Sequence, residues 1–182
     1  MKVFINPGHD REYDSGAINP SNGLREADVA ADIGVKVADY LQAAGCEVQI
    51  LQSDNLYWDS PYPLKCVCDE ANSMPADIFV SLHCNAANTE ARGTEVEVYQ
   101  MDGGESCTLA QCIQSQIVRS LGTVDRGLKE RPGLIVLKHT DMPAVLVETA
   151  FIDNDDDAAL LVDRADDFAR AIARGITDYE QE

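Results

Sequence analysis

The 182-residue sequence has no long apolar run and few basic residues. No run approaches the roughly 20 apolar residues that a bilayer-spanning helix needs, so we expect no membrane span. Only 14 lysines and arginines stand against 32 acidic residues, which gives a net charge of −18. Because nucleic acids and anionic membranes both attract basic surfaces, we expect neither as a partner. No secretory signal is recognisable, since Lys2 leads directly into a predicted strand.

Several motifs that identify enzyme classes are also absent. The sequence contains no HExxH, no GxGxxG after its first strand, no GxxxxGK[ST] and no GxSxG, so those protease, nucleotide-binding and hydrolase classes have no support. Six cysteines are scattered without the CxxC spacing of a structural zinc site, and we expect buried, reduced thiols. Cys84 is not expected to act as a nucleophile with His83, because adjacent strand residues point to opposite faces.

Short apolar segments typical of strands alternate with longer amphipathic segments typical of helices. Strands are predicted at 2–6, 47–51, 77–83, 93–100, 134–137 and 144–147, and helices at 24–44, 64–73, 108–121 and 166–179. This order predicts one α/β domain over residues 1–182, with a mixed, mostly parallel central sheet of about six strands and helices on both faces.

The segments between these elements also carry predictions. The alternation of apolar and polar residues at 93–100 favours a half-exposed edge strand. Residues 122–133 are predicted as a loop and residues 153–157 as an acidic turn, because both are rich in turn formers and charge. Residues 53–63 are predicted as an irregular loop that contains Tyr57, Trp58 and Tyr62.

Four side chains suited to metal chemistry lie near the ends of predicted elements. His9 follows the first strand, His83 ends the third and Glu148 closes the last. Glu26 lies in the first turn of the first helix, on the side of its apolar residues. Because sites in open α/β sheets form beyond the carboxyl ends of the strands, we expect the four to share one crevice. Each alone is a weaker signal, since single histidines after strands and acids at helix starts are commonly structural.

Two imidazoles and one carboxylate are a common ligand set for catalytic zinc, which keeps one coordination position for water. Zinc lowers the pKa of bound water from about 16 to about 7, and a carboxylate outside the ligand set can carry the proton to a leaving amine. From the residues alone, other acids compete as ligands: Asp10, Asp77, Asp153 and Asp155.

With these motifs the sequence resembles the zinc-dependent N-acetylmuramoyl-L-alanine amidases, which cut bacterial peptidoglycan. The resemblance covers about residues 2–178. It is carried by NPGH at 6–9, GA at 16–17, Glu26, AN at 71–72, ADIFVSLHCNA at 76–86, GTEV at 93–96, RGLK at 126–129, VL at 136–137, PAVLVE at 143–148 and FIDN at 151–154. By this resemblance His9, Glu26 and His83 hold Zn²⁺. It also implies that Glu148 is the catalytic carboxylate.

The chain departs from the family pattern around the expected site. Asn6, Asp10 and Cys84 stand where the family commonly has Asp, Gly and Ala. Val67 stands where an arginine is usual, and ETAF at 148–151 replaces a glycine-containing segment. None of these departures removes a ligand or the catalytic acid, so they bear on the shape of the substrate groove and on the rate.

The resemblance implies a hydrolase that cleaves the amide between the lactyl group of N-acetylmuramic acid and the L-alanine of the stem peptide. Another zinc hydrolase, acting on muropeptides or small amides, is one alternative, and a non-catalytic wall-binding or regulatory module is a second. We expect a monomer that acts on peptidoglycan at the cell wall, outside the cell, as an autolysin or endolysin would.

The sequence contains no wall-binding repeats, and its acidity should repel an anionic wall. We therefore expect delivery by a targeting partner or a longer parent chain. Without a recognisable signal, a phage-type lysin and the excised domain of an exported protein both fit.

Overall fold

The chain folds around one six-stranded sheet. A computed structural model describes residues 1–57 and 62–182. The strands are Lys2–Pro7 (β1), Glu47–Ile50 (β2), Ile78–Asn85 (β3), Thr94–Val98 (β4), Asp125–Glu130 (β5) and Ala144–Phe151 (β6). The helices are Glu26–Ala43 (α1), Val67–Ser73 (α2), Glu105–Leu121 (α3), Ile135–His139 (α4), Asp155–Asp163 (α5) and Ala165–Tyr179 (α6). None of the helices in the described ranges has the length and apolar character that crossing a membrane requires.

The strands lie in the order β2-β1-β3-β6-β4-β5. β1 pairs in parallel with β2 and β3, and β3 pairs in parallel with β6. β4 runs antiparallel to β6, and β5 runs parallel to β4. The predicted mixed, mostly parallel sheet with six strands is therefore confirmed.

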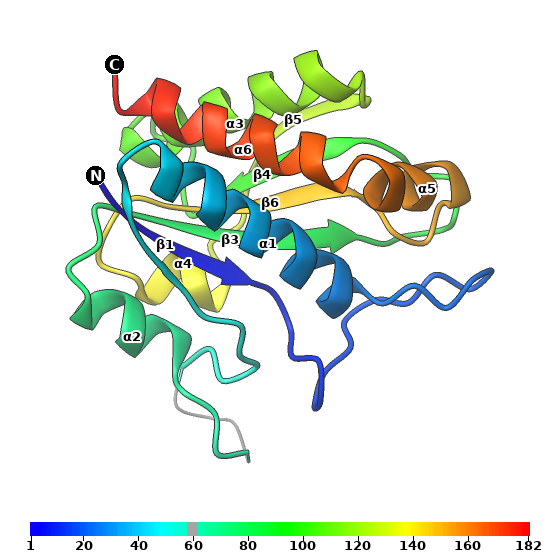
Figure 1. Cartoon of the computed structure of the whole chain (residues 1–182), viewed down its shortest axis with the longest axis horizontal. Coiled ribbons are helices and arrows are strands. Elements are labelled where there is room, and N and C mark those ends of the chain that lie inside the picture. Colours follow the sequence, from blue (N-terminus) through cyan, green and yellow to red (C-terminus); the bar gives the residue numbers. More distant parts are fainter. Residues whose placement is uncertain (58–61) are drawn as a thin grey trace.

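Helices cover both faces of the sheet, as predicted (Figure 1). α1, α3 and α6 lie over one face, where the larger apolar cluster contains Val3 and Ile5 of β1. α2 and α4 lie over the other face, where Phe4 of β1 stacks on Phe79 of β3 with ring centroids 5.7 Å apart. Alternate residues of each strand thus enter different cores, as the pleat of a strand requires.

The second core covers only part of its face. α2 and α4 contain 7 and 5 residues, and the strand residues they contact include Phe4, Phe79 and Leu146, which lie toward the amino-terminal ends of their strands. Nearer the carboxyl ends of β3 and β6, the same face carries His83 and Glu148. The short helices therefore leave polar side chains at this end of the sheet, and these form the candidate site.

The prediction of a half-exposed edge strand over residues 93–100 is wrong. β4 lies between β6 and β5, and all five of its residues are buried. Two glutamates alternate with valines in this strand, and each pairs with an arginine that follows it in the sequence. Glu95 lies 2.7 Å from Arg126, and Glu97 lies 3.0 Å from Arg131. The glutamates of β4 therefore alternate with valines because they pair with arginines, and not because one face of the strand is exposed to solvent.

The predicted loop at 122–133 contains β5, which forms the edge of the sheet next to β4. Its charged residues and Gly127, which has a left-handed φ of 70°, favour a loop when only the sequence is considered. The strand nevertheless pairs with β4, with a register shift between Thr94 and Val96. A bulge of this kind absorbs one extra residue without ending the pairing.

Two further segments are helical against expectation. The predicted strand at 134–137 lies largely in α4, because a short apolar run does not distinguish a buried strand from a buried helix. The predicted acidic turn at 153–157 contains the start of α5. The side chain of Asn154 accepts a hydrogen bond from the backbone N–H of Asp157, and acids in a first turn favour a helix N-terminus.

The segment 53–63 has no helix or strand among its described residues, as predicted. The ring of Tyr57 stacks on His139, and the ring of Tyr62 stacks on Tyr13, with centroids 4.0 and 4.1 Å apart. Trp58, which belongs to the same prediction, lies outside the described residues. The two tyrosines therefore join this loop to α4 and to the loop after β1.

The contact between α3 and α6 depends on a glycine. A Cβ atom placed on Gly175 of α6 would lie 2.6 Å from the Cα of Ile113 in α3, so the helices would have to separate. We expect Gly175→Ala to lower the free energy of unfolding by about 1–3 kcal/mol, despite the better helix propensity of alanine. Urea unfolding measures this change. Gly133→Ala, where the added Cβ meets no heavy atom within 4 Å, is the control, and equal stability of both variants would contradict the prediction.

Candidate metal centre

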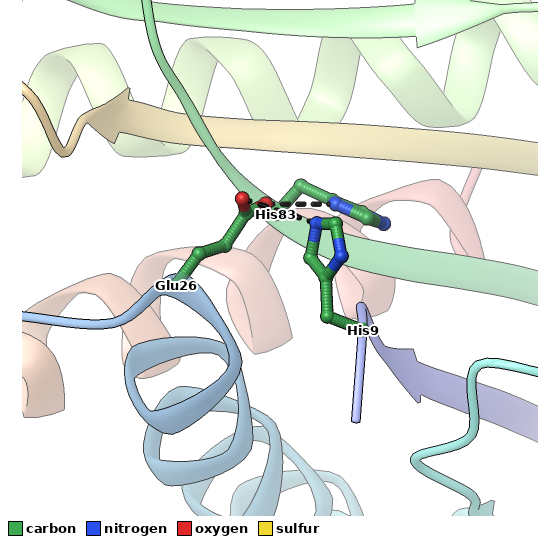
Figure 2. A group of neighbouring side chains, drawn as sticks. All are labelled: His9, Glu26 and His83. Carbon is green, nitrogen blue, oxygen red and sulfur yellow. Dashed lines mark hydrogen bonds and ion pairs between the residues drawn. The ribbon is translucent and has the colours of Figure 1, made fainter. Parts of the chain in front are cut away.

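Three of the predicted site residues come together in one cluster (Figure 2). His9 follows β1, Glu26 begins α1 and His83 lies in β3. One potential ligand atom from each lies within 4.8 Å of the others. Nε2 of His9 is 3.1 Å from Oε2 of Glu26, and Nδ1 of His83 is 2.9 Å from Oε1. The two imidazole rings meet edge to face, with centroids 4.9 Å apart.

The backbone around His9 is shaped for this approach. His9 has a left-handed φ of 62°, a conformation that is uncommon outside glycine but enriched in histidine. The preceding Gly8 has no side chain, and a Cβ there would lie 2.2 Å from the ring of His83. The Pro-Gly pair before His9 therefore does more than end the strand, since the glycine lets the second imidazole pass close to the chain.

Glu26 is held by the backbone as well as by the imidazoles. Its Oε1 accepts a hydrogen bond from the N–H of Cys84 at 3.0 Å, and its Oε2 accepts one from the N–H of Ala17 at 2.9 Å. The side chain is only 5% exposed. The first residue of α1 thus connects the loop after β1 with the carboxyl end of β3.

The electrostatics of the cluster favour a positive charge. Burial alone would lower the pKa of His9, but hydrogen bonds and charge from Glu26 and Asp14 outweigh it and raise the pKa to about 9. Burial would raise the pKa of Glu26, but His83 and His9 outweigh it and hold that pKa well below its usual range. A carboxylate between two imidazoles is also a donor set that suits zinc. The residues present therefore fit a divalent cation.

Glu148 occupies the neighbouring position on the sheet. It is paired in register with His83 of β3 on one side and with Glu95 of β4 on the other. Its Oε2 is buried and has no hydrogen-bond partner among the described residues. Burial, followed by the charges of Glu26 and Glu97, raises the pKa of Glu148 well above its usual range. A buried carboxyl group without a partner is costly, and such groups are concentrated at functional sites.

The predicted strand ends differ in detail from the observed ones. β3 continues two residues past His83, and β6 continues three residues past Glu148. The competing acids lie outside the cluster and accept hydrogen bonds elsewhere: Asp10, Asp77, Asp153 and Asp155. Cys84 faces the larger apolar core and is 3% exposed, so its expected packing role is confirmed. All six cysteines are free, and four of them are buried.

Sequence reasoning did not single out Asp14, which contacts the cluster. Its Oδ2 lies 2.5 Å from Nδ1 of His9, and its Oδ1 accepts a hydrogen bond from the N–H of Gly16. A carboxylate at Nδ1 keeps the proton on that nitrogen and leaves Nε2 free to face Glu26. The available signal was an acid five residues after a candidate ligand, but its contact depends on a turn that spacing does not specify.

We expect Asp14→Asn to weaken metal binding about 10–100-fold, the usual effect of losing a carboxylate behind a histidine ligand. Competition with a chromophoric chelator measures this affinity directly. Glu12→Gln, an exposed change in the same loop, should retain the affinity of the wild type. Unchanged affinity in Asp14→Asn would show that the contact does not orient His9.

Comparison with known proteins identifies the family of this chain. A family model described as N-acetylmuramoyl-L-alanine amidase matches residues 3–178. N-acetylmuramoyl-L-alanine amidase LytC of Bacillus subtilis (strain 168) is 39% identical over 181 residues, which cover 97% of this chain and 35% of LytC. The endolysin of Bacillus phage SPP1 is 36% identical over 180 residues, which cover 95% of this chain and 62% of the endolysin.

The fold is also similar to that of a solved amidase structure. The solved structure of N-acetylmuramoyl-L-alanine amidase AmiC2 of Nostoc punctiforme superposes with a TM-score of 0.86 at 30% identity, covering 100% of this chain and 98% of that one. The chain spans only 35% of LytC and 62% of the phage endolysin. Since the family model matches nearly the whole sequence, the chain belongs to the N-acetylmuramoyl-L-alanine amidase family.

Proposed function

We propose that residues 1–182 form the catalytic domain of a zinc-dependent peptidoglycan amidase, with cleavage at the bond between the lactyl group of N-acetylmuramic acid and L-alanine. The observation that carries the proposal is the cluster of His9, Glu26 and His83 beside a glutamate oxygen, Oε2 of Glu148, that is buried with no partner among the described residues, in a chain of this family. These three residues would hold the zinc ion. Zinc bound there supplies a Lewis acid for the carbonyl oxygen and lowers the pKa of water.

Glu148 is the proton carrier of the proposed reaction. Its carboxylate accepts a proton from the attacking water, whose oxygen forms a bond to the carbonyl carbon. The carboxyl group then gives the proton to the nitrogen of L-alanine as the carbon–nitrogen bond breaks. The products are the free lactyl carboxylate and a stem peptide with a free amino terminus. A raised pKa suits a group that must both accept and return a proton near neutral pH.

The domain would act at the cell wall, in keeping with the names of its relatives, an N-acetylmuramoyl-L-alanine amidase and a phage endolysin. Both relatives are longer than this chain, which supports targeting through a parent chain. Delivery by a separate partner stays a prediction. The monomeric state stays a prediction.

The direct test is product analysis on purified peptidoglycan. We expect new amino-terminal L-alanine to appear with the zinc-loaded protein, to disappear after chelation and to return when zinc is added. Cleavage inside the stem peptide would instead indicate a muropeptide peptidase. Tight wall binding without any product would indicate a non-catalytic module, and full activity of the metal-free protein would overturn the proposed chemistry.

A further inference from the structure

A row of charged side chains extends from the candidate site across the open end of the sheet. His83, Glu148 and Glu95 lie opposite one another on β3, β6 and β4. Directly opposed residues project from the same face of a sheet. Because Val96 and Val98 enter the larger core on the other face, Glu95 must lie on the face of Glu148. Arg126 of β5 continues the row by pairing with Glu95.

The guanidinium group of Arg126 is fixed on two sides. Its Nε donates to Oε2 of Glu95 at 2.7 Å, while Oε1 of the same glutamate accepts from Nδ2 of Asn85 at 3.0 Å. Its central carbon lies 4.8 Å from the centroid of the Phe151 ring, a contact that favours a cation over an aromatic face. Arg126 is therefore oriented before any ligand arrives.

The terminal nitrogens of Arg126 are unused. Neither has a hydrogen-bond partner in the described ranges 1–57 and 62–182, and the side chain is 35% exposed. Neutralising the buried Glu95 requires only the contact through Nε. The remaining two nitrogens form a planar fork, whose geometry matches a carboxylate with two parallel hydrogen bonds. Because the two nitrogens lie in the same row of side chains as Glu148, we infer that they bind a group of the substrate.

Resting on the function proposed above, we propose that Arg126 binds a free carboxylate of the stem peptide, on the amine side of the bond that is cut. The glycan side offers no such group near this bond, because the lactyl carboxyl group is consumed in the amide. Adjacent strands lie about 4.8 Å apart, so Glu95, which the guanidinium group of Arg126 contacts, is about 10 Å from His83. An extended peptide advances about 3.3–3.6 Å per residue. The carboxylate therefore belongs to the second or third residue of the stem.

Matched synthetic muropeptides test this assignment. The two members of a pair have the same stem and differ at one carboxyl group, which is free in one member and a carboxamide in the other. One pair has this change at the second residue of the stem, and the other pair has it at the third. We expect the wild type to favour the free acid about 10–100-fold in kcat/KM for one of the two positions, mainly through KM, since hydrogen bonds between charged groups have this strength. In Arg126→Gln this ratio should fall to near one.

Two further variants complete the experiment. The double variant Glu95→Gln/Arg126→Gln does not leave a buried carboxylate unpaired. Its ratio of kcat/KM for the free acid to that for the carboxamide should also fall to near one. Arg92→Gln is the matched control, because Arg92 also contacts a buried acid, Asp157, through Nε, and it should keep the ratio of the wild type. A wild type that does not discriminate at either position, or a ratio that persists in both Arg126 variants, overturns the proposal. Failure of the wild type to cut either member of a pair would instead contradict the amidase function.

Discussion

Replacing Glu148 with glutamine should lower hydrolysis about 10²–10⁴-fold, the usual contribution of a general acid–base group. Glutamine has nearly the same shape, but it cannot accept and return a proton. The metal content should not change, because Glu148 lies outside the cluster formed by His9, Glu26 and His83. Release of amino-terminal L-alanine and elemental analysis measure the two properties. Retained activity in this variant would remove Glu148 from the proposed mechanism.

The same substitution should make the metal-free protein more stable at neutral pH. Burial raises the pKa of Glu148 above its ordinary value of 4.5. Below pH 4.5 the carboxyl group is protonated in both the folded and the unfolded chain, and its ionisation costs nothing. As the pH rises toward the raised pKa, the unfolded chain ionises first and folding becomes less favourable. Glutamine avoids this loss, so the stability difference should appear above pH 4.5, grow as the pH rises to the raised pKa and stay constant beyond it.

Denaturant unfolding at several pH values measures this difference. An exposed change, Glu90→Gln, is the control and should leave the pH profile of the wild type unaltered. A wild type that is more stable than Glu148→Gln at pH 8 would show that the carboxylate has a stabilising partner that offsets its burial.

Replacing Glu26 with glutamine should remove metal binding and activity together. A neutral amide is a poor zinc ligand, and two imidazoles alone leave the site incomplete. Loss of the several kcal/mol that a metal ion contributes to the transition state corresponds to about 10³-fold or more in rate. Zinc content and product release are the measurements, and Asp28→Asn, on the exposed side of the same helix turn, is the control.

Glu26→Gln should also destabilise the metal-free fold, for a reason visible in its hydrogen bonds. The N–H of Cys84 and the N–H of Ala17 donate to different oxygens of one carboxylate. Glutamine offers only one oxygen, so one backbone donor loses its acceptor, at a cost of about 1–3 kcal/mol. A variant that keeps stoichiometric zinc and full stability would contradict both parts of the prediction.

The cluster of His9, Glu26 and His83 could be predicted from the sequence, because the residue types show its chemistry and parallel strands bring their carboxyl ends to one edge of the sheet. There are only three histidines, and two of them lie at or just beyond the carboxyl-terminal parts of neighbouring strands. Glu26 follows because the start of a crossover helix returns to the same edge of the sheet. In each case the residue type and the element are enough to fix the approximate position.

The sequence was insufficient where a position depends on side-chain pairing. Glu95 and Glu97 alternate like exposed residues because the arginines that bury them lie about 30 residues later. Arg126 itself appeared to belong to a loop, since Gly127 and neighbouring charges conceal a bulged edge strand. Asp14 reaches His9 only because the chain turns back at residues 11–13, where Asp10 and Asp14 form a β-bridge. Spacing along the chain carries no information about these contacts.

One carboxylate, that of Glu26, anchors the loop after β1 through Ala17 and the carboxyl end of β3 through Cys84, while it faces both imidazoles. Arg126 belongs to a separate network, with Glu95, Asn85 and Phe151. Protein engineers therefore have two regions with different tolerance. Under the proposed roles, redesign of substrate preference can begin at β4 and β5, whereas a change of metal preference would require rebuilding the anchor of a loop and a strand at the same time.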